Sequence, residues 1–119
     1  MTLNQLSARA RRVRTLYAQL EIRRGGRAWT RAELAQGFVG DVGDLMKLVM
    51  AKEGLRSAKN VDAALAHELA DCLWSVLVLA ESYNIDLAAA FGRTMTGLER
   101  KLRPRRATNR ARSARAGLT

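Results

Sequence analysis

A chain of 119 residues is long enough for one small domain with a core, yet short enough for dimerisation to help its stability. Aromatic residues make only 5% of the sequence, whereas Leu and Ala are abundant, which favours helices over sheets. The single cysteine, Cys72, excludes an internal disulfide and fits a reducing cytoplasm. The start of the chain has no apolar segment, and the longest apolar run, residues 69–80, is too short for a bilayer, so we expect neither a signal peptide nor a membrane partner.

Apolar residues recur at three- and four-residue steps, or fill short continuous runs, in four stretches of the chain, which predicts an all-α fold. The expected helices run from Leu3 to the Gly25–Gly26 pair, from Thr30 to about Lys52, from Asn60 to about Ser82, and from Leu87 to about Leu102. The second helix has the clearest start, because Thr30 and Glu33 have the spacing of a capping box. Pro104 is the only proline, so none of the four helices need be broken by one.

Two pairs of carboxylates carry the strongest functional signal. Asp41 and Asp44 in the second helix, and Glu68 and Asp71 in the third, are each three residues apart, so the members of a pair lie on one face of a helix. Four acids that point from two helices into a common space repel one another unless a cation holds them, and oxygen-only sites suit Mg²⁺ or Mn²⁺. The alternative is that each pair belongs to a solvated stripe. His67 adjoins Glu68 but points about 100° away, so we expect it to be exposed.

Two further features concern packing. The third helix is apolar nearly all round between residues 69 and 80, and four short helices can hardly enclose such a helix, so we expect a homodimer or homotetramer. In the second helix Gly37, Gly40 and Gly43 line one side at a cost of about 1 kcal/mol each relative to alanine. This row either admits a neighbouring backbone or ligand phosphate, or marks a kink.

The net charge of +10 lies at the two ends of the chain. Residues 1–29 and residues 103–119 each contribute +6, whereas residues 30–102 contribute −2. The segment 103–119 is rich in Arg, Ala, Ser and Thr and has no apolar period, so we expect a disordered tail. Nucleic acid is a possible partner of such a basic tail, through attraction between charges that does not depend on sequence. The alternative is a solvated end.

The residues of the second, third and fourth helices resemble a known family. The resemblance rests on Trp29, on Glu33-Leu34, on the run Gly40-Asp41-Val42-Gly43-Asp44-Leu45, on His67-Glu68-Leu69-Ala70-Asp71, and on Ile85-Asp86-Leu87. The pattern is similar to that of the MazG-like all-α nucleotide pyrophosphohydrolases, whose signature is ExxE, a spacer, and ExxD. The resemblance covers roughly residues 29–102. It implies a helical domain over residues 1–102, folded as a four-helix bundle that is completed by dimerisation. It also implies hydrolysis of a nucleoside triphosphate to the monophosphate and pyrophosphate, with Mg²⁺ as the cofactor and Mn²⁺ as a possible substitute.

Carried over by position, Asp41 and Asp44 stand where the family has its first two glutamates, and Glu68 and Asp71 match the second pair. The resemblance thus implies that these four residues are the metal ligands and catalytic residues, with Asp41 as the group that takes a proton from water. Aspartate is one methylene shorter than glutamate, so the metal must lie nearer the second helix. Relatives have a Lys and an Asn in the last helix, where this chain has Thr94 and Leu98 near those positions. The candidates for substrate contacts are therefore Lys47, Lys52, Arg56, Lys59, Arg93 and, by stacking on the base, Trp29. The alternative for Trp29 is a place in the core or in a subunit interface.

These departures leave three hypotheses. The first is an active pyrophosphohydrolase that removes non-standard or excess nucleotides. The second is a non-catalytic relative that binds a nucleotide or a metal. The third is a small nucleic-acid-associated protein that uses its basic ends.

Overall fold

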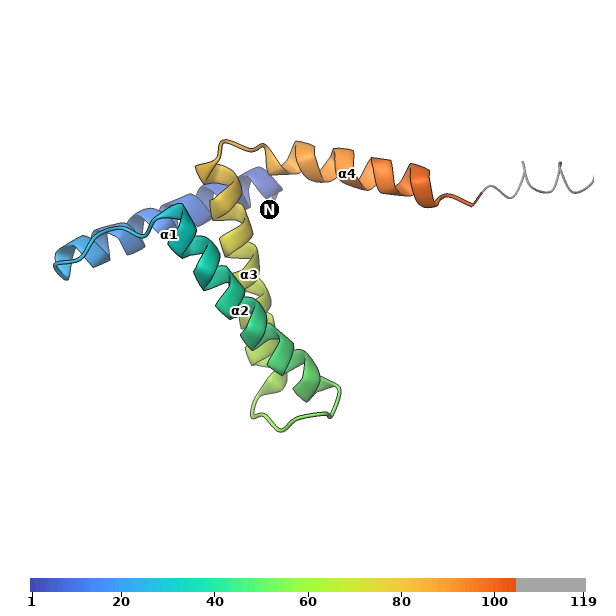
Figure 1. The fold of residues 1–119 in the computed structure, drawn as a ribbon, viewed down its shortest axis with the longest axis horizontal. Coiled ribbons are helices and arrows are strands. Elements are labelled where there is room, and N and C mark those ends of the chain that lie inside the picture. The colour runs from blue at the N-terminus through green and yellow to red at the C-terminus, as the bar shows by residue number, and fades with distance from the viewer. Residues whose placement is uncertain (105–119) are drawn as a thin grey trace, which may run out of the picture. The chain divides into compact units, whose positions relative to one another are not determined.

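The structure, a computed structural model, describes residues 1–104 and consists there of four α-helices (Figure 1). The helices are α1 (Leu3–Arg23), α2 (Arg31–Lys52), α3 (Val61–Ser82) and α4 (Leu87–Leu102). These bounds confirm the all-α prediction and the four expected helices. The predicted disordered tail falls mainly on residues 105–119, which lie outside the described residues.

Short polar side chains and left-handed residues set the helix ends. Before α2, the Glu33 amide donates to the Thr30 hydroxyl at 3.2 Å and the Thr30 amide donates to the Glu33 carboxylate at 3.0 Å, so the predicted capping box is confirmed. Thr2 and Gln5 form a second capping box at the start of α1. Gly25, with φ of +83°, ends α1 in a conformation that favours glycine. Asn60 precedes α3 with φ of 51°, but its side chain makes no capping hydrogen bond.

The first three helices pack as one unit over residues 1–88, in which α3 contacts both α1 and α2. In Figure 1, α2 and α3 lie side by side and α1 crosses the carboxyl-terminal half of α3. The core is built at this crossing from Ala10, Leu34, Leu77 and Val78, and Val78 is only 1% exposed. The Trp74 indole N–H donates to the Ala10 carbonyl at 3.2 Å, so the one polar atom of that large side chain is satisfied where α3 meets α1.

Within one chain α3 is covered only in part. Leu69 and Leu73, in the middle of the helix, are 53% and 43% exposed, whereas Leu77 and Val78 one to two turns later are buried. By length and mean hydropathy alone, α3 could span a membrane. Core helices of soluble proteins have the same two properties. The packing of α3 against α1 and α2 accounts for part of its apolar surface. The covering of the remainder by a second subunit stays a prediction.

The last helix, α4, falls largely in a second unit and is described by itself. Its apolar side chains recur at helical spacing on one face, and Phe91, Leu98 and Leu102 are exposed. Arg100 and Lys101 lie in its last turn, where positive charge interacts favourably with the carboxyl end of a helix.

Candidate metal centre

The two neighbouring helices α2 and α3 bring three of the four predicted acids together. Each of Asp41, Asp44 and Glu68 offers a carboxylate oxygen, and these oxygens all lie within 4.8 Å of one another. Asp41 and Asp44 are adjacent on α2 because of their three-residue spacing, and Glu68 faces them from α3. The shorter aspartates therefore still reach the glutamate across the gap between the helices. We refer to these three residues as the acid cluster.

Burial and mutual repulsion disfavour the ionised forms of the carboxyl groups in the acid cluster. The Glu68 Oε2 atom is buried and has no hydrogen-bond partner among the described residues. Burial raises the pKa of Glu68, and the charges of Asp41, Asp71 and Asp44 raise it further. Burial likewise raises the pKa of Asp41, with Asp71 and Asp44 adding to the effect. A cation bound between these oxygens would offset both costs.

The donor set fits a hard divalent cation. Mg²⁺ binds oxygen ligands at about 2.0–2.1 Å, so two of its ligands lie about 3 Å apart when adjacent and about 4 Å apart when opposite. The oxygens of the acid cluster, within 4.8 Å of one another, need only small side-chain rotations to reach these separations. Cys72, next to Asp71 in the chain, is free and half-buried, and burial raises the pKa of its thiol, which disfavours the thiolate that softer metals prefer.

The fourth acid, Asp71, lies one turn from Glu68 and contacts a neighbouring histidine on the same helix. Its carboxylate is 3.2 Å from the His67 Nε2 atom, at the i,i+4 spacing of a helix pair. The His67 side chain is exposed, as expected, but it contacts a candidate ligand. The i,i+4 relation of His67 and Asp71 was readable in the sequence. Asp71 is close enough for its charge to raise the pKa of both Asp41 and Glu68.

These pKa shifts predict that the metal-free protein is more stable in mild acid than at neutral pH. The pKa values of Asp41 and Glu68 are higher in the folded chain than in the unfolded chain, so the two carboxylates destabilise the fold once the pH exceeds their folded values. The unfolding temperature, measured in a chelator, should therefore rise as the pH is lowered from neutral toward the ordinary carboxyl values, 4.5 for Glu68 and 3.8 for Asp41. Glu33, whose pKa is lowered to about 2 by its contact with Arg27, loses its stabilising effect only below its ordinary value of 4.5.

The control for this pH effect is the double variant Asp41→Asn, Glu68→Gln, which removes both titrating groups. Its unfolding temperature should change less over the same pH range. An equal pH dependence in the variant would show that other groups cause the effect.

A pocket of about 500 Å³ adjoins the acid cluster. It lies among the first three helices, and Asp41 and Asp71 line one part of it, so the pocket and the acid cluster share a carboxylate. Its aromatic lining consists of Tyr17, Trp29 and Trp74, and the rings of Tyr17 and Trp74 meet edge to face at 5.8 Å. A volume of this size is within the range of pockets that bind small molecules.

Trp29 enters this pocket because α2 has a glycine beside it. A Cβ atom added to Gly37 would lie 3.2 Å from the Trp29 ring, tighter than ordinary contact, whereas Cβ atoms on Gly40 and Gly43 would meet nothing within 4 Å. The close approach predicted for the glycine row therefore occurs at Gly37, and a side chain rather than a backbone or a phosphate makes it.

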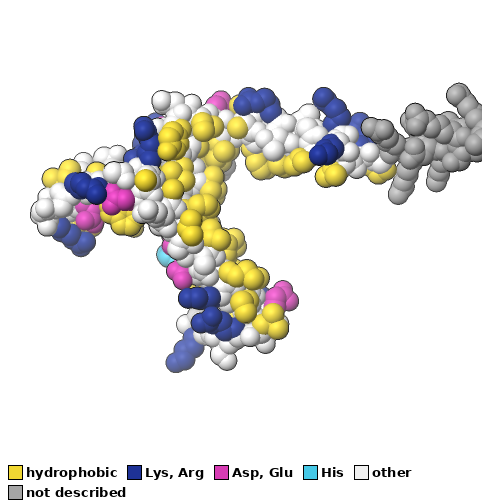
Figure 2. Space-filling view, in the orientation of Figure 1, with side chains coloured by type: hydrophobic (Ala, Val, Ile, Leu, Met, Phe, Trp, Pro, Cys, Tyr) yellow, Lys and Arg dark blue, Asp and Glu magenta, His cyan; other side chains and the backbone are white. Residues whose placement is uncertain are grey.

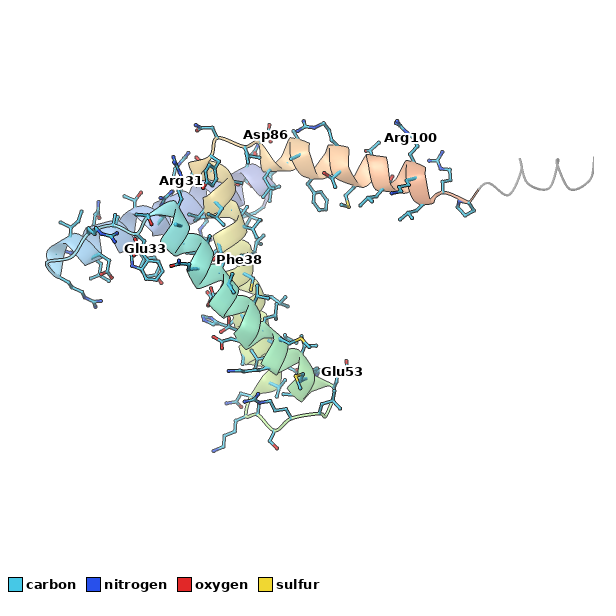
Figure 3. The ribbon with its side chains drawn as sticks, in the orientation of Figure 1. Arg31, Glu33, Phe38, Glu53, Asp86 and Arg100 are labelled. Atoms are coloured by element: carbon cyan, nitrogen blue, oxygen red, sulfur yellow. The ribbon has the colours of Figure 1, made fainter. Side chains whose placement is uncertain are left out.

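Figure 3 shows the start of α2, where Glu33 is labelled, and Arg27 pairs with that residue at 2.6 Å.

The structure brings one of the five candidate phosphate-binding cations to the acids. The Lys47 ammonium is 3.9 Å from the Asp44 carboxylate, one turn along α2. Lys52 pairs with Asp62 at the far end of the α2–α3 pair, about 12 Å along α2 from Asp44. Arg56 and Lys59 are exposed in the segment that joins α2 to α3. Arg93 lies on α4, in the other unit.

A comparison with protein families finds one match. Residues 30–106 match the model of the MazG nucleotide pyrophosphohydrolase domain, and this region contains all four predicted acids but excludes α1 and Trp29. Among curated proteins and among solved structures, nothing matches the chain significantly.

Proposed function

Because the chain belongs to the MazG nucleotide pyrophosphohydrolase family, we propose that it hydrolyses a ribo- or deoxyribonucleoside triphosphate to the monophosphate and pyrophosphate, using Mg²⁺. Non-standard or excess cytoplasmic nucleotides are the proposed substrates. The family acts on nucleoside triphosphates, and the observation that carries the proposal for this chain is the acid cluster, whose three carboxylate oxygens lie within 4.8 Å of one another.

Each acid has a proposed role. Asp41, Asp44 and Glu68 hold the metal, and Asp71 completes the set from the next turn of α3. When bound, Mg²⁺ supplies neutralising charge to the phosphates and acidifies a water molecule. Asp41 accepts the proton of the attacking water in this proposal, because it lines both the acid cluster and the pocket.

The base of the nucleotide occupies the neighbouring pocket in this proposal. A triphosphate bound at the acid cluster would extend its sugar and base past Asp41 toward Trp29 and Tyr17. Lys47, beside Asp44, contacts the phosphates and stabilises negative charge on the departing pyrophosphate. Lys52, Arg56, Lys59 and Arg93 remain candidates for the same task.

The experiment that tests the proposal is pyrophosphate release from a panel of ribo-, deoxyribo- and modified nucleoside triphosphates, with Mg²⁺ and with Mn²⁺. Turnover of at least one member, lost in Glu68→Gln protein, is the expected result. If no member is turned over but nucleotides still bind, a role as a non-catalytic nucleotide sensor replaces this proposal.

Trp29 supplies a second, more specific prediction. Stacking of a base on an aromatic side chain is worth about 1–3 kcal/mol, so Trp29→Ala should raise KM by about five- to 150-fold. Trp29→Phe should retain most of the affinity, because it keeps an aromatic face. Steady-state kinetics on the preferred triphosphate measure this difference. Equal KM values for wild type and Trp29→Ala would place the base elsewhere.

We also propose that the active form is a homodimer that pairs through α2 and α3. The exposed apolar side chains of these helices form an apolar stripe, which consists of Val39, Val42, Met46 and Val49 on α2 and of Leu69 and Leu73 on α3. The α2 members are spaced by three, four and three residues, as at the interface positions of a coiled coil. Figure 2 shows hydrophobic side chains running along one side of this helix pair. Exposed apolar surface of this extent favours association.

The apolar stripe is compatible with an open acid cluster. Val39 precedes Asp41 by two residues and Met46 follows Asp44 by two, so each points about 200° away from its acidic neighbour around the helix. Pairing of two chains through the stripe would therefore leave the acids accessible to a nucleotide and its metal.

A further inference from the structure

Three arginines of α1 share one face of the helix and have no ion-pair partner among residues 1–104. Arg9, Arg12 and Arg23 are exposed and lie within about 60° of one another around the helix axis. Arg12 follows the buried Ala10 by two residues, so it points about 200° away from the contact with α3. We call these three residues the arginine face.

Other arginines of the same region have structural partners. Arg11 pairs with Glu81 of α3, and Arg27 pairs with Glu33 at the start of α2. The Arg31 guanidinium lies over the Tyr83 ring, 4.9 Å from its centroid. The arginine face therefore carries positive charge that the described fold does not use, within a segment, residues 1–29, whose formal charge is +6.

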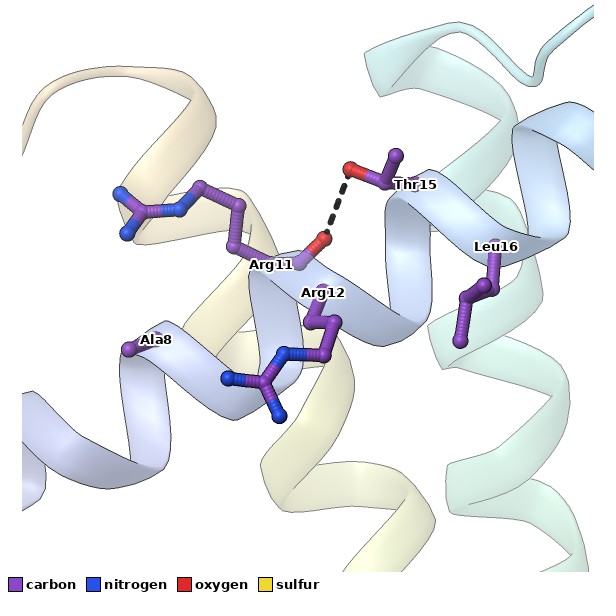
Figure 4. Close-up of a pocket in the computed structure, with 5 residues that line it drawn as sticks. All are labelled: Ala8, Arg11, Arg12, Thr15 and Leu16. Atoms are coloured by element: carbon purple, nitrogen blue, oxygen red, sulfur yellow. Dashed lines mark hydrogen bonds between the residues drawn. The ribbon is translucent and has the colours of Figure 1, made fainter.

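A shallow groove of about 310 Å³ runs beside the arginine face (Figure 4). Its lining includes Ala8, Arg12 and Leu16, and the Thr15 hydroxyl at its edge donates to the Arg11 carbonyl at 3.1 Å. In Figure 4 the Arg12 side chain extends beside Ala8, whose small side chain leaves room for an anion to approach the helix. A phosphate group fits this combination, because a guanidinium binds its oxygens through two parallel hydrogen bonds.

The chemistry of the arginine face favours a nucleic-acid duplex over a single strand or an anionic membrane. Tyr17 is the only aromatic residue of α1 and lines the pocket beside α3, so none is left on the arginine face to stack on the bases of a single strand. An anionic membrane would require a continuous apolar face, but α1 packs part of its apolar surface against α3. Of its exposed apolar residues, Val13 and Tyr17 line the pocket, and Leu16 and Ile22 lie about 120° apart around the helix. α1 is about 30 Å long, close to one turn of a DNA duplex.

We propose that the arginine face of α1 binds the phosphate backbone of double-stranded nucleic acid without reading its sequence. This activity is separate from the proposed hydrolysis, because α1 lies outside the family-matched region and the arginine face points away from the pocket. A nucleotide and a duplex can therefore be bound by the same chain at once.

The test is fluorescence anisotropy of the full chain with a labelled DNA duplex of about 20 base pairs, over a range of salt concentrations. The variant Arg9→Gln, Arg12→Gln, Arg23→Gln is compared with a matched variant at the carboxyl end of α4 and the residue after it, Arg100→Gln, Lys101→Gln, Arg103→Gln, which removes the same charge. We call the second protein the α4 variant. The α1 variant should bind at least about tenfold more weakly than wild type at low salt, with a salt slope smaller by about 2–3. The α4 variant should bind more tightly than the α1 variant.

Both variants keep the basic segment 104–119, so a loss specific to the α1 variant identifies the arginine face. Equal losses in the two variants, unchanged binding in the α1 variant, or no binding by wild type at low salt would each overturn the proposal. Tighter binding to anionic vesicles than to the duplex would overturn it as well. Unchanged pyrophosphate release, or an unchanged circular dichroism spectrum if the chain is inactive, confirms that the α1 variant is folded.

Discussion

Glu68→Gln protein should release pyrophosphate at least about a thousandfold more slowly than wild type. The amide removes one negative charge from the acid cluster while it keeps the length of the side chain. Glu68 is the member of the acid cluster contributed by α3, and its buried Oε2 atom has no hydrogen-bond partner among the described residues, so this oxygen is free to bind a cation. Neutralisation of phosphate charge by a bound cation is worth several kcal/mol, and each 1.4 kcal/mol corresponds to a tenfold change in rate.

The matched control is Glu53→Gln, the same substitution at the exposed carboxyl end of α2, where Glu53 is labelled in Figure 3. Glu53→Gln protein should retain wild-type turnover. The Glu68→Gln protein should also fail to gain thermal stability on addition of Mg²⁺, which provides a readout independent of turnover. A Glu68→Gln protein that kept both its turnover and its stabilisation by Mg²⁺ would exclude the acid cluster as the metal site.

Val42→Glu, Met46→Glu protein should be monomeric at concentrations at which wild type is a dimer. Both residues lie in the middle of the α2 part of the apolar stripe, and Met46 is 57% exposed in the single chain. In a two-fold symmetric pair each substitution occurs twice, so four carboxylates would be placed in one interface. Burial of an unpaired charge costs several kcal/mol, so the dissociation constant should rise by at least about a thousandfold. Sedimentation equilibrium measures it.

Leu55→Glu is the control for the dimer prediction. Leu55 is 73% exposed and apolar, but it lies in the segment between α2 and α3, outside the apolar stripe. The Leu55→Glu protein should associate like wild type, so a general effect of added negative charge can be recognised. A wild-type chain that sediments as a monomer at micromolar concentrations would contradict the dimer itself.

Much of the fold was readable from the sequence because its signals are local. The capping box of Thr30 and Glu33 depends on three-residue spacing, and the end of α1 depends on a glycine with positive φ. The sequence also predicted the two acid pairs, because a helix places residues three apart on one face. The contact between His67 and Asp71 is equally local, because the two residues have the i,i+4 spacing of neighbours on one helix face.

The contacts between helices could not be predicted in the same way. Nothing in the spacing of Trp29 and Gly37 indicates that the ring lies against that glycine, because the chain turns between them before α2 begins. In the sequence, Lys47, Lys52, Arg56 and Lys59 are equal candidates for contacts to the phosphates. In the fold, Lys47 lies beside Asp44, whereas Lys52 pairs with Asp62 at the far end of α2 and the other two follow that helix. Likewise, the excess of arginine in residues 1–29 did not reveal which side chains pair within the fold.

The sequence by itself determined the four helices and the two pairs of acids, since these follow from side-chain periodicity along a single helix. It also carries the motifs by which residues 30–106 match the family. Only the tertiary structure decided that α2 and α3 lie side by side, with Glu68 opposite Asp41 and Asp44, and that α1 closes a pocket beside them. The physical reason is that helix packing depends on the burial of whole apolar faces, which many pairings of the same helices could satisfy until all of them are placed together.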